Sequence, residues 1–205
     1  MSRRTLPRAF YARPTLDVAA ALIGKVLVHT TPSGRAAGRI IEVEAYIGED
    51  DPACHAAPGP TARNQPLYGV PGHAYVYLNY GMHYLMNVVT EVEGYPAGVL
   101  LRALDPVDGL ELMRRRRARG TGKPASSFPD ESLCRGPGNL SKALGITLAD
   151  NRLDLTRSQL RVEDWGLRAL PVAWTPRIGL RVGVDRAWRC HEAGSRLVSG
   201  RLGRT

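Results

Sequence analysis

The sequence predicts a single α+β domain spanning residues 1–205, with an antiparallel or mixed sheet. Two general properties support one compact domain. A length of 205 residues suits a single unit with a full hydrophobic core, and an apolar content of 43% is typical of ordinary globular proteins. The third observation concerns topology. The predicted strands follow one another mostly through hairpin turns, rather than through the helices of regular β-α-β units, which favours the α+β class.

The N-terminal region predicts one helix followed by a hairpin. Residues 16–23 form the helix, with Thr15 as its N-cap and Gly24 as its end. An alternating pattern predicts a strand over 25–30. After a Pro-Ser-Gly-Arg turn, a second strand over roughly 38–46 pairs back on the first.

Residues 47–73 are rich in Gly, Pro and Ala and have no clear period, so they are predicted to form a long ordered loop. A loop of this length inside a compact domain is usually functional. Three β-rich segments follow, joined by turns; they cover residues 74–79, 83–90 and 98–104, with the turns at Tyr80–Gly81 and Glu93–Gly94.

The second half of the chain predicts two helices and then mostly β structure through Val198. The first helix is capped by Asp108, runs to Arg119 and ends at Gly120. After a loop over 121–130, a short helix covers roughly 138–144 and ends at Gly145.

Four consecutive arginines, Arg114–Arg117, lie on the first of these helices. Consecutive helical residues point in four directions, so these side chains cannot all contact one line of phosphates. The sequence therefore favours a solvated helix face over a nucleic-acid contact for this run.

The charge of the chain indicates a polyanionic partner. Net charge is +9 and the isoelectric point is about 9.9, which places nucleic acid first among partner classes. The basic residues are 25 Arg and only 3 Lys, a bias that can also reflect genome composition. Arginine nevertheless suits bidentate contacts to phosphate better than lysine does.

Cysteine usage and hydropathy exclude several classes of protein. The cysteines Cys54, Cys134 and Cys190 are too few and too irregular for a disulfide framework, and we expect reduced thiols. Two Cys-His pairs, at Cys54 and Cys190, lack zinc-finger spacing, so we expect no metal. The chain has no long apolar run and no secretory signal, so we expect no membrane contact and a cytoplasmic location, nucleoid-associated if the source is bacterial.

The segment Arg39–Tyr46 carries the first candidate chemistry. Alternation along a strand places Glu42, Glu44 and Tyr46 on one face. Such a face is either exposed to solvent beside an arginine or the wall of a site, since the strand leads directly into the long loop. A carboxylate beside a tyrosine suits glycosidic hydrolysis, because it stabilises an oxocarbenium-like transition state and takes a proton from water.

The second candidate is a tyrosine cluster over residues 75–84. Tyr75, Tyr77 and Asn79 share a strand face, and Tyr80 lies at the glycine turn. A tyrosine at a hairpin tip is poorly placed for a core. The pattern fits equally an amphipathic strand pair with solvated hydroxyls and a platform on which bases stack.

From Phe10 to Ser199 the chain resembles the alkyladenine (3-methyladenine) DNA glycosylase family, in the branch that includes the mammalian enzymes. Several long motifs occur in the family's order. They are Ile41-Glu-Val-Glu-Ala-Tyr46, His55, Thr61-Ala-Arg-Asn64, Gly72-His-Ala-Tyr-Val-Tyr-Leu-Asn-Tyr-Gly-Met-His83, Asn87-Val-Val89, Leu100-Leu-Arg-Ala-Leu-Asp-Pro106, Gly136-Pro-Gly-Asn-Leu140, Ala143-Leu-Gly-Ile146 and Pro176-Arg-Ile-Gly179.

The resemblance implies a compact α+β domain with a curved, mostly antiparallel sheet, surrounding helices and no cofactor. It implies a monofunctional DNA glycosylase of base excision repair that removes alkylated or deaminated purines, of the 3-methyladenine and hypoxanthine type. Glu44 would be the general base for the attacking water, and Arg102 would position that carboxylate and the water.

The same resemblance assigns the remaining site residues. Tyr46 and Tyr77 would sandwich the flipped base, and His55 would contact the base or its sugar. Asn87 would crowd the exocyclic amino group of guanine. Tyr80 would enter the minor groove and fill the gap left by the flipped nucleotide. The expected partner is double-stranded DNA containing a damaged purine, with no obligate protein partner.

Two other functions stay open on the residues alone. A non-enzymatic nucleic-acid-binding module explains the charge and the tyrosines but gives Glu42 and Glu44 no task. A small-molecule nucleoside hydrolase uses the carboxylate and the tyrosines but leaves the excess positive charge unexplained. A metal-dependent hydrolase is disfavoured, because the sequence has no Asp/His cluster at ligand spacing.

Overall fold

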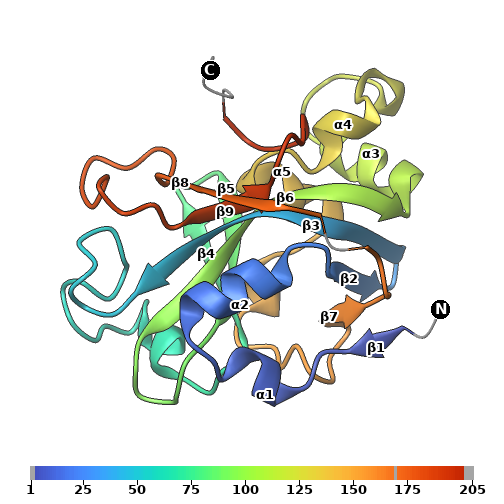
Figure 1. The fold of residues 1–205 in the computed structure, drawn as a ribbon. Helices are drawn as coiled ribbons and strands as arrows, with labels where there is room; N and C mark the ends of the chain where they lie inside the picture. The colour runs from blue at the N-terminus through green and yellow to red at the C-terminus, as the bar shows by residue number, and fades with distance from the viewer. Residues whose placement is uncertain (1–2, 169, 201–205) are drawn as a thin grey trace.

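A computed structural model describes residues 3–168 and 170–200 of the chain (Figure 1). Its strands are β1 (Arg4–Thr5), β2 (Val26–Thr31), β3 (Gly34–Ile47), β4 (Ala74–Asn79), β5 (His83–Val89), β6 (Ala97–Asp108), β7 (Leu160–Asp164), β8 (Val172–Thr175) and β9 (Arg189–Glu192). Its α-helices are α1 (Arg8–Tyr11), α2 (Thr15–Leu22), α3 (Leu110–Ala118), α4 (Asp130–Leu133) and α5 (Pro137–Leu144). Three short 3₁₀-helices are η1 (Gln65–Tyr68), η2 (Ala125–Ser127) and η3 (Leu148–Asp150).

These strands form one curled, nine-stranded sheet in which every pairing is antiparallel, so the predicted α+β class is confirmed. The order is β1-β7-β2-β3-β6-β5-β4, with β9 beside β3 and β8 beside β9. Strand β3 runs through the middle of the molecule (Figure 1). One of its edges pairs with β6 along most of its length.

The other edge of β3 changes partner part-way along the strand. Residues 34–39 pair with β2, whereas Glu42–Glu44 pair with β9. Two of the three shifts in the β3–β6 register fall at the same place, between Ile40 and Val43, and the third lies between Ala37 and Gly38. Such bulges bend a strand and increase its twist. Glu42 and Glu44 therefore lie at a bend of β3, where this N-terminal strand meets the C-terminal strand β9.

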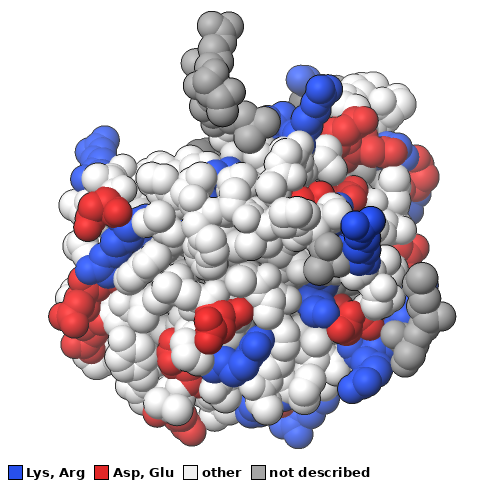
Figure 2. Space-filling model, in the orientation of Figure 1, with Lys and Arg blue, Asp and Glu red and all other residues white. Residues whose placement is uncertain are grey.

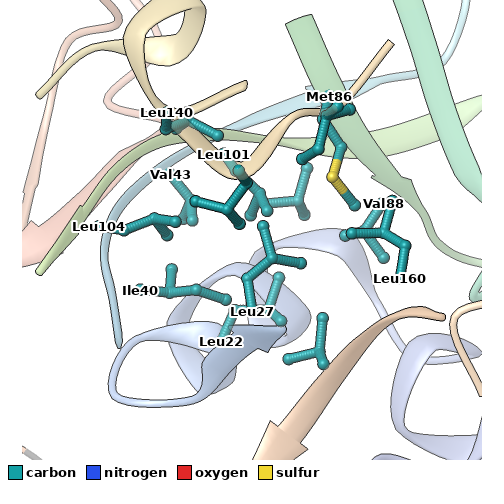
Figure 3. Close-up of a cluster of buried hydrophobic side chains, with 14 of the residues drawn as sticks. Leu22, Leu27, Ile40, Val43, Met86, Val88, Leu101, Leu104, Leu140 and Leu160 are labelled. Atoms are coloured by element: carbon teal, nitrogen blue, oxygen red, sulfur yellow. The ribbon is translucent and has the colours of Figure 1, made fainter. Parts of the chain in front are cut away.

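The main core lies between the sheet, α2 and α5 (Figure 3). Leu22 of α2 and Leu140 of α5 belong to the same buried cluster as side chains from seven strands, including Leu27, Ile40 and Leu101. Truncating a buried leucine of this kind to alanine typically costs about 2–5 kcal/mol. This core anchors the strands that carry the candidate site.

The two predicted helix caps are wrong. Thr15 is the first residue of α2, and Pro14 precedes it as the cap. The Thr15 hydroxyl instead binds Glu91 at 2.7 Å and Thr90 at 2.9 Å. Asp108 does not cap α3 either, because β6 continues through it and its carboxylate pairs with an arginine of β3. Gly109, with φ of +73°, makes the connection to α3.

The arginine run of α3 is not the solvated face that the sequence favours. Arg114 pairs with Asp130 at the start of α4, and Arg117 donates to two carbonyls at the end of that helix. Arg116 donates to the last two carbonyls of α5, at 3.3 and 2.7 Å. Of the four, only Arg115 is exposed, and the other three are half-buried. The run therefore joins α3 to both neighbouring helices, because cationic donors satisfy carbonyls that a helix end leaves open.

Of the remaining predictions about secondary structure, some are confirmed and one is wrong. Strand β4 has the predicted bounds, and Gly145, at φ of +75°, ends α5 as predicted. The region after α5 was predicted to be mostly β but contains only short strands in irregular backbone. Within the described part of the chain, no helix has the length and hydropathy needed to cross a bilayer.

Candidate active site

Glu44 is the centre of a buried polar network on β3. Its side chain is fully buried and accepts hydrogen bonds from three donors. Tyr46 Oη and Arg102 Nη1 donate to Oε2 at 2.9 and 3.0 Å, and the backbone N–H of Ile178 donates to Oε1 at 2.7 Å. A carboxylate offers about four acceptor positions, so one position on Oε1 remains free for a further donor.

Arg102 bridges the two glutamates of β3. It lies on β6, whose antiparallel register sets Leu100 opposite Glu44 and Ala103 opposite Glu42. Its Nε lies 3.3 Å from Glu42 Oε1, while its Nη1 reaches Glu44. Both carboxylates therefore lie on one side of the strand, as alternation along β3 predicts.

Glu42 is buried as deeply as Glu44, but its contacts connect parts of the fold rather than face the site. Arg189 Nε lies 2.6 Å from its Oε1, and the Ser199 hydroxyl donates to the same oxygen at 2.9 Å. Glu42 thus joins β3 to β9 and to the last described residues. Four donors occupy the acceptor positions of Glu42, and it does not line the cavity described next.

A cavity of about 320 Å³ opens directly in front of Glu44. Glu44 does not line it, but its three donors Tyr46, Arg102 and Ile178 do. The carboxylate therefore lies one layer behind the cavity wall. The volume is at the lower end of the range for small-molecule sites, and an unstacked purine is of suitable size for it.

Aromatic side chains form much of the cavity wall. Tyr77 lies with its ring centroid 4.4 Å from that of His55 and 5.4 Å from that of Tyr75. Burial, and secondarily Tyr75, raise the pKa of Tyr77 above its usual range, so its ring and hydroxyl stay neutral. Tyr46 also lines the cavity, and burial and then the Glu44 carboxylate raise its pKa in the same way.

His55 lies in the long loop and is held in this wall by specific contacts. Its Nδ1 is 2.8 Å from the Tyr75 hydroxyl. Burial, and then the positive charge of Arg63, lower the pKa of His55, so the imidazole is neutral near pH 7. Asn64 supports the loop by donating to the His55 carbonyl at 2.7 Å and to that of Gly59 at 2.9 Å.

Two further predicted residues lie at the base and the mouth of the cavity. Asn87, on β5, lines the cavity and donates to the Tyr75 carbonyl at 3.2 Å. Tyr80 is at the tip of the β4–β5 hairpin and is 87% exposed. Positive φ angles of +48° and +69° at Tyr80 and Gly81 form the tight turn that projects the ring outward. The structure therefore gathers all seven predicted site residues around one cavity.

The sequence matches the profile of the methylpurine-DNA glycosylase family over residues 9–196. The chain belongs to that family. Three relatives are each provisionally named a 3-methyladenine DNA glycosylase. The protein of Methanocella arvoryzae is 48% identical over 200 residues, covering 96% of both chains. That of Burkholderia lata is 46% identical, covering 95% of this chain and 91% of its own. That of Clostridium acetobutylicum is 40% identical, covering 95% and 97%.

As a member of the methylpurine-DNA glycosylase family, the protein is a hydrolase of the DNA glycosylase type. This membership agrees with the enzymatic hypothesis rather than with the non-enzymatic binding module. The described residues bring together no group of three or more His, Cys, Asp and Glu side chains that could hold a metal.

This glycosylase site also uses a pair that the sequence did not reveal, Asp51 and Arg177. Both are fully buried, and their side-chain contacts are 2.5 and 2.8 Å long. Burial alone would raise the pKa of Asp51, but the hydrogen bonds from Arg177 lower it. The guanidinium also lies 4.6 Å from the centre of the Tyr46 ring. The pair therefore fixes the segment that presents the Ile178 N–H to Glu44. The only sequence signal was the Pro176–Gly179 motif, to which no role was assigned.

Proposed function

We propose that the protein removes damaged purines from double-stranded DNA by flipping the nucleotide into the cavity and hydrolysing the N-glycosidic bond. Alkylated purines of the 3-methyladenine type are its main substrates, deaminated purines of the hypoxanthine type are further ones, and base excision repair is its setting. The observation that carries this proposal is an aromatic cavity of purine size whose wall includes the three donors to a buried glutamate.

Flipping is required because a base inside the helical stack is out of reach of such a cavity. Tyr80 stands at the mouth, exposed and on a rigid turn, where it fills the space that the nucleotide leaves. Wedge residues of this kind offset unstacking costs of a few kcal/mol. Stacking of the base between Tyr46 and Tyr77 returns about 1–3 kcal/mol per stacked base.

The hydrolytic water donates to the free acceptor position on Glu44 Oε1, beside the Ile178 amide. As its oxygen attacks C1′ of the sugar, the bond from C1′ to the base nitrogen breaks and its electrons leave with the base. The water proton passes to Glu44. A cationic alkylated purine leaves as a neutral base and needs no further proton. The carboxylate also stabilises positive charge on the sugar during bond cleavage.

Selection among bases falls to the polar groups of the cavity. Neutral His55 offers one donor or acceptor to the base or its sugar. Asn87 is held against the Tyr75 carbonyl and cannot easily move aside, so it excludes the exocyclic amino group of guanine. Damaged purines lack this conflict or bind more strongly, because aromatic faces attract a cationic alkylated base.

A panel of duplexes, each with one defined lesion, tests the proposal by detection of released free base. We expect release from 3-methyladenine duplexes and slower release from hypoxanthine duplexes. The corresponding free nucleosides are the control. Cleavage of nucleosides at rates equal to those of duplexes would identify a small-molecule hydrolase. Absence of release from every duplex would contradict the proposal.

A further inference from the structure

A second and larger hollow lies on the other side of the hairpin from the cavity. Its volume is about 670 Å³, and it lies between the β2–β3 turn, the hairpin and the helices α3 and α5. We call it the basic groove, because its lining includes four cationic side chains: Arg115, Arg116, Arg119 and Lys142.

The positive charge of the basic groove is not neutralised by the protein. No acidic residue lines it, and among the described residues none of its four cations forms an ion pair. On the face shown in Figure 2, by contrast, basic and acidic side chains lie next to each other. Arg114 of α3 does not line the groove, and it too forms ion pairs, with Glu111 and Asp130.

The contacts of Arg116 show how the groove holds its charge. Its guanidinium donates only to neutral acceptors, namely two carbonyls of α5 and the hydroxyls of Thr31 and Ser33. Burial, and then the charges of Arg119 and Arg115, lower the pKa of Arg116. The cations therefore repel one another in the free protein, and a bound anion would relieve that repulsion.

The basic groove adjoins the cavity along the chain. Tyr80 lines the cavity and Met82, two residues later, lines the groove and is 73% exposed. At the start of α5, Pro137 lines the cavity and Gly138 lines the groove. A long polyanion whose nucleotide enters the cavity at the hairpin tip must continue past the hairpin on both sides of that nucleotide. On one of these sides, its path leads into the groove.

We propose that the basic groove binds the sugar–phosphate backbone of the same duplex whose damaged nucleotide enters the cavity. This inference rests on the proposed function for the identity of the polyanion. Each strand of a duplex carries one backbone phosphate per about 3.4 Å of helix axis, so several can contact a surface with four cations at once. The groove adds affinity and register without reading sequence. It acts on binding, while bond cleavage takes place at Glu44.

A comparison of two charge-matched triple variants tests this role. The first, Arg115→Gln/Arg119→Gln/Lys142→Gln, removes three exposed cations of the groove and spares Arg116, which joins helices. The control, Arg4→Gln/Arg157→Gln/Arg168→Gln, removes three exposed cations on and near other elements. Thermal melting first establishes that both variants fold. Fluorescence anisotropy then measures the dissociation constant of an undamaged duplex and of an abasic-analogue duplex at several salt concentrations.

We expect the groove variant to bind both duplexes more weakly than the control, with a slope of log K against log salt smaller by about 2–3. Each lost phosphate contact removes about 0.9 from that slope. Its single-turnover excision rate at saturating enzyme should equal that of the wild type. Equal slopes for the two triple variants would overturn the proposal. So would loss of their difference when inorganic phosphate is added at constant ionic strength, because that result indicates a small-anion site.

The two proposals fail in distinguishable ways. If no lesion is excised, the proposed function fails, but the slopes on undamaged duplex still report whether the groove holds a backbone. If excision occurs and the slopes of the two variants agree, only the groove assignment fails.

Discussion

The Tyr46 hydroxyl donates to Glu44 Oε2 at 2.9 Å, from a position two residues further along the same strand. In the proposed mechanism, this contact joins the tyrosine that stacks on the base to the carboxylate that activates water. A ring displaced by an incoming base would disturb the carboxylate, so we expect base binding and hydrolysis to be linked through this bond. The Arg102 guanidinium donates to the same oxygen and opposes such a displacement.

The first prediction concerns this carboxylate. Glu44→Gln should lower the excision rate by about 10²–10⁴-fold or more, because it removes a general base and a negative charge near the sugar. The variant should fold and bind DNA, although it is less stable by about 1–3 kcal/mol, since the amide cannot satisfy three donors at once. Single-turnover excision and a thermal melt measure both effects.

Glu42→Gln is the matched control for that experiment. It removes the same charge, from the same strand and from contact with the same Arg102. Arg102, Arg189 and Ser199 already occupy the acceptor positions of Glu42, so none is left for an attacking water, and its loss should cost stability but only modest activity. If Glu42→Gln lost excision while Glu44→Gln kept it, the general base would be Glu42.

Tyr80→Ala should separate flipping from chemistry. The ring is 87% exposed, so the free energy of unfolding should change by no more than ~0.5 kcal/mol. Excision of a well-paired lesion should slow more than that of a mispaired one, because a mismatch already lowers the cost of flipping. Tyr77→Ala, which damages the cavity wall, should slow both. Unchanged excision of both lesions by Tyr80→Ala would remove the hairpin from the DNA interface.

No Schiff-base intermediate should form with a lysine of this chain. Lys25 Nζ is 2.7 Å from Asp164, Lys142 Nζ donates to the Arg119 carbonyl, and no lysine lines the cavity. A glycosylase that also cleaves the strand uses an amine nucleophile. Borohydride added during excision should therefore trap no protein–DNA adduct. An adduct mapped to Lys25, Lys123 or Lys142 would show that water is not the only nucleophile.

His55 should make a specific contribution to the pH dependence of stability. Its pKa is lowered in the folded protein, mainly by burial and then by Arg63, whereas in the unfolded chain it returns to about 6.5. Below about pH 6.5, His55 therefore binds a proton in the unfolded chain but not in the folded protein. The free energy of unfolding falls as a result. The His55→Gln variant has no titrating group at this position, so it should not lose stability in this way. Melting temperatures of both proteins between neutral and mildly acidic pH should diverge; parallel curves would place His55 in a different environment.

Local patterns in the sequence were sufficient to predict part of this fold. The bounds of β4 and the end of α5 follow from alternation and from a glycine in a left-handed conformation, which depend on a few neighbouring residues. The failed cap at Thr15 shows the limit of such patterns. Its hydroxyl binds Glu91, which is 76 residues away, and no local pattern contains that partner.

The candidate site divides in the same way. Glu44 and Tyr46 were recognisable because they alternate on one strand and match a family motif. Asp51 and Arg177 are 126 residues apart, and their pairing depends on how two irregular segments pack. The arginine run of α3 was predicted to be solvated because a helical wheel does not reveal that neighbouring helices present their carbonyl ends to it.

The hydrogen bond from Ile178 to Glu44 joins residues 134 positions apart. Chains are made from the N-terminus, and the early parts of a protein begin to fold while the rest is still being synthesised. The strand that carries Glu44 is therefore made long before its backbone donor. A growing or truncated chain that ends before residue 176 has the carboxylate and most of the aromatic wall, but not the amide beside the water position. We therefore expect excision capacity to appear only late in synthesis, and C-terminal truncation to abolish repair even where an earlier part of the domain folds.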